Sequence, residues 1–489
     1  MENTKVKEEK MNIPRIMIAA PSSASGKTSV TIALLKNLKD AGLNPVSVKA
    51  GPDYIDPLFH RTVTGVEAFN LDTFFTDDDT TVKLFETDAK GHGIAVLEGV
   101  MGLYDGIGGV KEEGSSYALA KVTKTPVILV VNAKGAGRSL AALIAGMKAF
   151  DSEELIRGVI LNRISEKFYE IIKPVIEEET GVKVLGFLPE RKDVMLSSRH
   201  LGLVTPDEVK ELKQITERLA DELKENADLD EMIKIANSAP DLPEEGSVRS
   251  ESTEGSDCNA ALWQDDFRQN VSQNGKTCTI AISKDEAFQF FYEENVRMLQ
   301  NLGAEIVFFS PLHDKEVPKE ADAVILCGGY PELYLDKISS NTGMAESIRS
   351  CYGKGMPLIA ECGGFIYLHK TIYDRDGKAY PGAGIIDSTC SYTGKSVRFG
   401  YISIKEKTPD FLKENSVIKG HEFHYYESDH NGNDCVAVKP FGGQNYECIQ
   451  ANPVSWLGFA HLYYPSNPDF ARSIVKKASL FRLNRFSFF

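Results

Sequence analysis

The sequence predicts two α/β domains in series, the first of them a doubly wound parallel sheet. Short β-branched runs alternate with helical stretches in the first half of the chain, the composition changes near residue 240, and a second alternating pattern follows. A chain of 489 residues is also longer than one ordinary domain, and each half is long enough to bury a core of its own.

Six runs predict the buried parallel strands of the first domain. They are RIMIAAP, PVSVKAG, IAVLEGV, PVILVVN, IRGVILNR and VKVLGFLP, each beside a segment of helical periodicity. Such alternation is typical of a parallel sheet covered by helices. We assign residues 13–238 to this domain and residues 1–12, which mix both charges, to an N-terminal tail.

The next segment, residues 239–276, is rich in Ser, Glu, Gly and Asn and poor in aliphatic residues, which predicts a flexible acidic linker. A second series of strands then begins with CTIAIS, AEIVFFSP, ADAVILCGG and GMPLIAECGG, with a helix through YEENVRMLQNLG. We assign residues 277–489 to the second domain.

Charge and composition limit the classes of function. The formal net charge of −15 discourages binding to nucleic acid and to anionic membranes. No apolar run reaches the length of a membrane-spanning helix, and the N-terminus lacks the apolar core of a signal peptide, so we expect a cytoplasmic protein. The eight cysteines show no CxxC pairs, which predicts free thiols, at most one of them chemically active.

A phosphate-binding loop is predicted between the first strand and the first helix. The segment SSASGKTS follows a buried strand and opens a helix near Lys27, although Pro21 stands where the Walker A pattern has its first glycine. Small residues and a helix N-terminus suit phosphate oxygens, with Lys27 reaching the outer phosphates and Thr28 a magnesium ion. The predicted ATP-binding residues are Ser22, Ser23, Ala24, Ser25, Gly26, Lys27, Thr28 and Ser29.

Acidic residues follow two of the predicted strands. KAGPDYIDP supplies Asp53 and Asp56, and LEGVMGLYDG supplies Glu98 and Asp105. Parallel strands end at one edge of a sheet, where ligands bind, and Mg²⁺ prefers oxygen donors. A lone carboxylate would more often be a helix cap or a turn residue, but several near a phosphate-binding loop favour a metal site.

The second domain carries the pattern of a nucleophile elbow. In PLIAECGGFIYL a strand turns sharply into a helix at Cys362, and we expect the helix N-terminus to lower the pKa of this thiol. Gly328 and Gly329 in ILCGGYPEL, together with Gly363, predict an oxyanion hole made of backbone N–H groups.

Three histidines are candidates for the base that acts with Cys362, and the residues alone do not choose among them. His461 in LGFAHLYYPSNP is a candidate, and His421 and His424 in GHEFHYY are its rivals.

The N-terminal motifs resemble those of a known family. APSSASGKTS, KAGPDYIDPLFHRTVTG, NLD and EGVMGLYDGIGG are similar to segments of the cobyrinic acid a,c-diamide synthases. The N-terminal domain of that family is similar to dethiobiotin synthetase and, more remotely, to the MinD/ParA ATPases. Its loop does not require the first glycine of Walker A. A MinD-type switch, our remote alternative, has a signature lysine where this chain has Ser22.

The resemblance also implies roles for individual residues. Thr28, Asp53 and Glu98 would bind Mg²⁺ with ATP. The site where the substrate carboxylate is phosphorylated would include the following residues: Tyr54, Ile55, Asp56, Asp105, Arg199 and His200. Tyr54 and Ile55 are equally explained as packing residues, and an exposed Arg199 as a solvated one.

The C-terminal motifs resemble the class I glutamine amidotransferases of the triad type. That resemblance selects His461 as the base that acts with Cys362. Most members carry a glutamate two residues after the histidine, whereas this chain has Tyr463. The cobyrinic and cobyric acid synthases share this departure, so the group that orients His461 stays open.

Together, the resemblances imply an ATP- and glutamine-dependent ligase that converts the a and c acetate side chains of a tetrapyrrole into acetamides. Two substrates fit equally well: cobyrinic acid, on the route to cobalamin, and nickel sirohydrochlorin, on the route to the nickel coenzyme of methanogenesis. Cobyric acid synthase is a more distant alternative because it lacks GPDYIDP. The family's habit also leads us to expect a homodimer.

Overall fold

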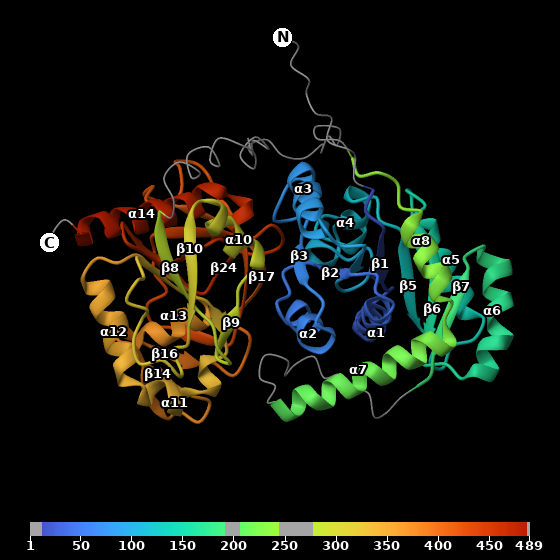
Figure 1. Cartoon of the computed structure of the whole chain (residues 1–489), viewed down its shortest axis with the longest axis horizontal. Helices are drawn as coiled ribbons and strands as arrows, with labels where there is room; N and C mark the ends of the chain where they lie inside the picture. The colour runs from blue at the N-terminus through green and yellow to red at the C-terminus, as the bar shows by residue number, and fades with distance from the viewer. Residues whose placement is uncertain (1–11, 191–205, 244–276, 487–489) are drawn as a thin grey trace, which may run out of the picture. The chain divides into compact units, whose positions relative to one another are not determined.

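The structure is a computed structural model that describes residues 12–190, 206–243 and 277–486. The chain divides into two compact units, one within residues 1–256 and one within residues 257–489. Figure 1 shows both units, each with strands enclosed by helices.

The first unit is built on a seven-stranded sheet in which every pair of neighbours is parallel, with the order β3-β2-β4-β1-β5-β6-β7. Its strands are β1 (Arg15–Ala19), β2 (Pro45–Ala50), β3 (Ala68–Leu71), β4 (Ile94–Glu98), β5 (Val127–Asn132), β6 (Ile156–Asn162) and β7 (Val184–Leu188). Its helices are α1 (Lys27–Asp40), α2 (Ile55–Thr64), α3 (Asp78–Ala89), α4 (Ser116–Val122), α5 (Ser139–Ala149), α6 (Glu166–Thr180), α7 (Pro206–Asn226) and α8 (Leu229–Asn237).

The six strands expected from the sequence are all present, and the first helix begins at Lys27 as predicted. The sequence analysis missed β3, which has only four residues and is too short for a recognisable pattern. Apolar residues of α1, α2, α7 and α8 pack together on one face of the sheet. Because all seven strands are parallel, the loops after β1, β2, β4 and β6 leave from the same edge.

The second unit has a six-stranded central sheet, β10-β8-β11-β13-β23-β22, in which only the β22–β23 pair is antiparallel. Its strands are β8 (Cys278–Ser283), β10 (Ala304–Phe309), β11 (Ala323–Leu326), β13 (Leu358–Glu361), β22 (Gln450–Asn452) and β23 (Ser455–Gly458). The helices are α10 (Glu293–Asn301), α11 (Leu335–Ser340), α12 (Thr342–Gly353), α13 (Gly363–Leu368) and α14 (Pro468–Phe486).

Three smaller sheets complete this unit. The first pairs β9 (Phe288–Phe290) with β12 (Gly328–Gly329). The second contains β14 (His369–Tyr373), β15 (Ala379–Pro381), β16 (Ile386–Tyr392) and β19 (Tyr426–Ser428). The third contains β17 (Arg398–Glu406), β18 (Ile418–His424), β20 (Cys435–Val438), β21 (Tyr446–Cys448) and β24 (His461–Leu462).

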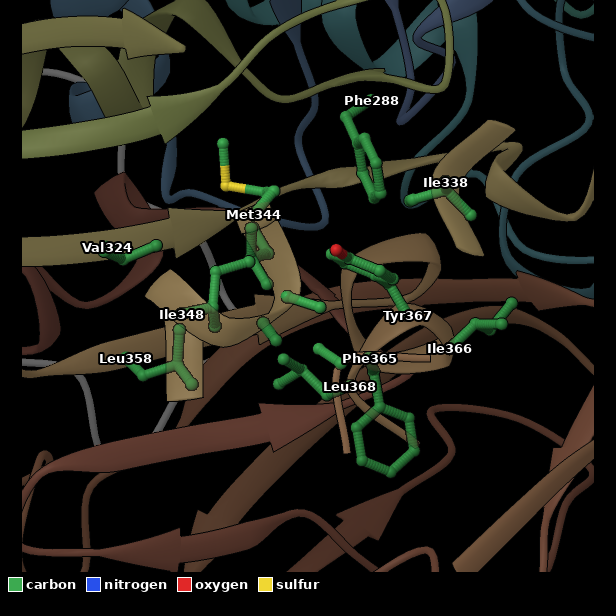
Figure 2. Packing of buried hydrophobic residues seen from close by; sticks show 14 of the residues in the cluster. Phe288, Val324, Ile338, Met344, Ile348, Leu358, Phe365, Ile366, Tyr367 and Leu368 are labelled. Atoms are coloured by element: carbon green, nitrogen blue, oxygen red, sulfur yellow. The ribbon is translucent and has the colours of Figure 1, made fainter. Parts of the chain in front are cut away.

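Two apolar clusters fill this unit, one on each face of the central sheet. Figure 2 shows part of the first, where residues of α13 lie close to Met344 and Ile348 of α12 and to Leu358 of β13. The helix that follows Cys362 is thus anchored by a buried apolar face.

The start of the segment that we assigned to the linker packs on the first unit. Ala239 and Leu242 are buried, and the buried guanidinium of Arg15 donates a hydrogen bond to Pro240 O. Residues 244–276 lie outside the described part of the chain. Within residues 12–190, 206–243 and 277–486, no helix is both long and apolar enough to span a bilayer.

Candidate active sites

The phosphate-binding loop connects β1 to α1 and is held by a residue from β6. Asn162 Nδ2 donates a hydrogen bond of 2.8 Å to Ser25 O. Gly26 adopts the left-handed conformation with φ of 102°, and a Cβ built there would lie 2.1 Å from Asn162 Nδ2. A glycine is therefore required next to Asn162, a residue to which the sequence analysis gave no role.

The small residues of the loop leave its backbone accessible. Ser22, Ser23 and Ala24 are exposed, Ser29 is half-buried, and the buried Ser25 donates its hydroxyl to Ser22 O at 2.9 Å. This arrangement leaves room for an anion above the start of α1.

Lys27 is buried at the start of α1, and its ammonium is held by carbonyl oxygens. Nζ lies 2.5 Å from Met101 O and 3.3 Å from Ser22 O. Burial, and secondly the charge of Lys49, lowers the pKa of Lys27 to about 8. A phosphate near the loop would give this ammonium an anionic partner.

Glu98, at the end of β4, is the centre of a buried polar cluster. Its Oε1 accepts hydrogen bonds from Thr28 Oγ1 at 2.6 Å and from Lys49 Nζ at 3.1 Å. Its Oε2 lies 2.8 Å from His60 Nε2, and Lys49 Nζ also lies 2.5 Å from Asp56 Oδ2. The structure therefore brings together three of the predicted residues, Thr28, Asp56 and Glu98.

The sequence analysis assigned no role to Lys49 or His60, although both stand in the motif KAGPDYIDPLFH. Lys49 is a charged residue inside a strand that the sequence predicts to be buried, and this signal was available before the structure. His60 is buried on α2, where Ser47 Oγ lies 2.8 Å from its Nδ1, and that placement depends on the packing of α2 against β2.

The two carboxyl groups of this cluster have opposite pKa shifts. Burial raises the pKa of Glu98, but Lys49 and the hydrogen bonds of His60 and Thr28 lower it by more, so Glu98 stays ionised. Burial raises the pKa of Asp56 well above its ordinary value, and Lys49 lowers it by less. One ammonium thus faces one carboxylate and one carboxyl group that holds its proton readily.

The remaining predicted residues of this unit lie around the cluster. Asp53 Oδ1 accepts a hydrogen bond of 2.8 Å from Ile55 N, and Asp105 Oδ2 accepts one of 3.0 Å from Gly102 N. Burial lowers the pKa of Lys49, but the charges of Asp56, Glu98 and Asp53 raise it by more; the charge of Asp105 offsets a small part of the lowering at Lys27. Tyr54 is buried at the start of α2 and Ile55 is half-buried, whereas residues 199 and 200 lie outside the described residues.

In the second unit, Cys362 stands at a sharp turn between β13 and α13. Its φ of 46° and ψ of −102° are unusual for a residue with a side chain. Cys362 N donates to Gly458 O at 2.9 Å, and a Cβ built at Gly364 would lie 2.2 Å from Leu326 O. The central sheet thus holds the turn from both neighbouring strands, β11 and β23.

The three glycines predicted for the oxyanion hole lie beside this turn. A Cβ built at Gly363 would lie 3.0 Å from Gly329 N, so these two backbones approach closely. A Cβ built at Gly328 would lie 2.2 Å from His461 Cε1. Glycine at position 328 therefore leaves the space that the imidazole of His461 occupies.

His461 is buried on β24, directly opposite His421 of β18. The two rings stack with centroids 5.0 Å apart and planes inclined by 15°. Tyr292 OH lies 3.2 Å from His421 Nδ1, and the ring of Tyr463 packs edge-on against that of Tyr292. Tyr463 therefore packs against Tyr292, whose hydroxyl lies next to the stacking partner of His461.

The second rival, His424, has a different environment. Its Nδ1 lies 2.6 Å from Tyr426 O, and its ring stacks on Phe459 with centroids 4.0 Å apart. A backbone hydrogen bond and an aromatic contact explain this residue without a chemical role.

The expectation of a lowered thiol pKa is wrong for this structure. Burial raises the pKa of Cys362, and the charges of Glu332 and Glu422 raise it further. Helix α13 has only six residues, and burial is the largest influence on the pKa of this thiol. Burial also lowers the pKa of His461 well below its ordinary value, so the resting pair is a thiol and a neutral imidazole.

Comparisons with known proteins agree with the assignment of two domains. Residues 16–204 match the family model of the CobQ/CobB/MinD/ParA nucleotide binding domain. Residues 279–453 match that of the CobB/CobQ-like glutamine amidotransferase domain.

Three similar relatives carry the name cobyrinate a,c-diamide synthase. The protein of Thermoplasma volcanium is 40% identical over 85% of this chain and 86% of its own length. The protein of Listeria innocua is 40% identical over 84% of this chain and 86% of its own length. The protein of Thermoplasma acidophilum is 35% identical over 95% of this chain and 100% of its own length. The chain therefore belongs to the cobyrinate a,c-diamide synthase family, whose members are ATP-dependent ligases with glutamine as nitrogen donor.

Proposed function

We propose that this chain converts the a and c acetate side chains of cobyrinate into acetamides, with MgATP and glutamine as co-substrates. The observation that carries this proposal is the presence in one chain of two sites with complementary chemistry. One is a cationic loop beside buried carboxyl groups, suited to phosphoryl transfer. The other is a cysteine elbow whose neighbouring segment, Gly328 and Gly329, packs against a buried imidazole, an arrangement suited to releasing ammonia from an amide.

At the first site, the substrate carboxylate would attack the γ-phosphorus of ATP and form an acyl phosphate, with ADP leaving. Lys27 and the backbone N–H groups of residues 22–28 would bind the phosphates. Lys49 would lie close enough to compensate for charge that builds up during transfer. Ammonia would then attack the acyl carbon and expel phosphate, giving the amide.

The residues present fit a magnesium ion that arrives with the nucleotide. Among the described residues, no group of three or more His, Cys, Asp or Glu side chains is arranged to hold a metal alone. Mg²⁺ commonly takes one or two carboxylates and completes its shell with phosphate oxygens and water. Thr28 Oγ1 and Glu98 Oε1, which lie 2.6 Å apart, would provide two ligands, and the carboxylate of Asp53 would provide a third. The ion would supply charge neutralisation at the phosphates.

At the second site, His461 would take the proton of the Cys362 thiol as the sulfur attacks the amide carbon of glutamine. The oxyanion would receive hydrogen bonds from the N–H groups of Gly363 and of Gly328 or Gly329. His461 would return the proton to the leaving nitrogen, and ammonia would depart from a glutamyl thioester. Water would then hydrolyse the thioester to glutamate and restore the thiol.

A substrate panel tests the assignment. Purified protein, MgATP and glutamine are incubated anaerobically with cobyrinate or with nickel sirohydrochlorin, and the tetrapyrroles are analysed by mass spectrometry. We expect the diamide of cobyrinate. A diamide formed from nickel sirohydrochlorin alone would overturn the substrate and assign the alternative. Turnover of neither substrate, with glutamine still hydrolysed, would refute amidation of a tetrapyrrole.

We also propose a homodimer, supported by an apolar surface on α5. Leu143 is 43% exposed and Phe150, just after the helix, is 74% exposed. The small residues Ala142, Ala145 and Gly146 of the same helix are also exposed, which permits close contact with another helix. Light scattering is expected to give twice the monomer mass for the wild-type protein and the monomer mass for Phe150→Glu; a monomeric wild-type protein would refute the dimer.

A further inference from the structure

A half-buried acid beside the turn of the nucleophile, Glu332, has no role in the chemistry above. Glu332 belongs to a short 3-10 turn (Pro331–Leu333) that directly follows the oxyanion glycines. A Cβ built at Gly363 would lie 2.7 Å from Pro331 Cδ, so this turn rests on the first residue of α13. Oε2 of Glu332 is shut off from solvent and accepts no hydrogen bond from the residues that the structure describes.

The surroundings of Glu332 place its carboxyl group near the reacting thiol. Burial raises the pKa of Cys362 on the elbow, of Cys390 on β16 and of Tyr426 on β19, and the charge of Glu332 raises each of these pKa values further. Burial raises the pKa of Glu332 to about 7, and the charge of Arg375, in the turn between β14 and β15, offsets only part of that rise. The carboxyl group of Glu332 is therefore close enough to Cys362 to interact with it electrostatically. The positive charge of Arg375 does not fully neutralise this carboxyl group.

Glutamine carries an α-ammonium group, which has the positive charge needed to pair with the carboxylate of Glu332. When the amide carbon of glutamine is at Cys362 Sγ, the α-ammonium lies roughly 5 Å from that carbon in an extended conformer, given ordinary bond lengths. A buried carboxylate with a free oxygen is a strong acceptor for an ammonium, since such charged hydrogen bonds are about twice as strong as neutral ones.

We propose that Glu332 binds the α-ammonium of glutamine through Oε2 and thereby selects α-amino amides over simple amides. This proposal rests on the glutaminase activity proposed above. A substrate without the α-amino group would leave the carboxyl group buried and unpaired, which makes such a site discriminate strongly.

The test compares glutamine with glutaramate, which is glutamine without its α-amino group. Ammonia release is measured with full-length protein, MgATP and cobyrinate for wild type, Glu332→Gln and the control Glu346→Gln. Glu346 is an exposed residue on α12. We expect the wild type and the control to prefer glutamine by roughly 100-fold or more in kcat/KM. Glu332→Gln should reduce this preference below about 10-fold, mainly by raising KM for glutamine.

Equal losses with both substrates in Glu332→Gln would overturn the proposal, since they would mean a general structural or catalytic role. An unchanged preference would overturn it as well. Glu332→Asp, which keeps the charge, should retain most of the preference even if Glu332→Gln folds poorly; loss of the preference in a folded Glu332→Asp protein would count against recognition by charge. Absence of ammonia release from wild type with glutamine would instead refute the glutaminase function itself.

Discussion

Gly328→Ala is expected to disable the glutaminase by moving one imidazole. The new Cβ would lie 2.2 Å from His461 Cε1 and 2.9 Å from Nδ1, whereas ordinary contacts begin near 3.4 Å. The ring must therefore retreat by more than 1 Å, and His421 is stacked on it with centroids only 5.0 Å apart. The backbone of Gly328 is not in the left-handed region, so alanine adds no strain of its own there.

The size of the effect follows from this displacement. A misplacement of about 1 Å in a catalytic group costs on the order of 100-fold in rate, or about 2.7 kcal/mol of transition-state stabilisation. Overpacking should lower the stability of the second unit by about 1–3 kcal/mol. We therefore expect kcat/KM for glutamine to fall roughly 100-fold while the protein stays folded.

The assay distinguishes the glutaminase site from the ATP site by supplying nitrogen either as glutamine or as ammonia. ADP formation with cobyrinate is measured once with glutamine and once with ammonium chloride, and only the glutamine-dependent rate should fall. Gly353→Ala is the matched control, because a Cβ there meets no atom within 4 Å. A glutamine-dependent rate within threefold of wild type would refute the inferred position of His461. An equal loss with ammonia would show that the damage extends beyond the glutaminase.

Two further predictions concern the first unit. The folded-state pKa of Lys27, about 8, is below its unfolded value, so the unfolded chain binds more protons between these values and stability rises with pH through that window. Lys27→Met should therefore abolish ATP hydrolysis yet raise the free energy of unfolding of the nucleotide-free protein at pH 7 by up to about 3 kcal/mol. Urea denaturation should show a smaller gain at pH 10; a loss of stability at pH 7 would contradict this reasoning. Asn162→Ala removes the hydrogen bond to Ser25 O and should raise KM for ATP about tenfold, the equivalent of one lost hydrogen bond, without changing glutamine hydrolysis. Steady-state kinetics with each substrate would check this, and an unchanged KM would show that the loop holds its shape alone.

Structural features that depend on a run of consecutive residues could be predicted from the sequence. The phosphate-binding loop, the six longer strands of the first sheet and the elbow at Cys362 each depend on a local pattern of residue types. The four-residue β3 was missed because so short a strand has no periodicity to detect.

Features that depend on distant segments meeting could not be predicted in the same way. Asn162 reaches a loop that lies 137 residues earlier in the chain. The pKa of Cys362 was misjudged for a similar reason. A helix N-terminus is visible in the sequence, whereas the burial that dominates this thiol comes from strands and turns packed around it.

The ammonium of Lys49 has a consequence for the order in which ligands arrive. It already occupies the space between Asp56 and Glu98, where it contacts an oxygen of each. A divalent cation arriving alone would have to displace this buried ammonium and would meet like charge. A cation that arrived bound to a triphosphate would bring negative charge that offsets the charges of Lys27 and Lys49. We therefore expect this site to accept a divalent cation together with the nucleotide and not before it.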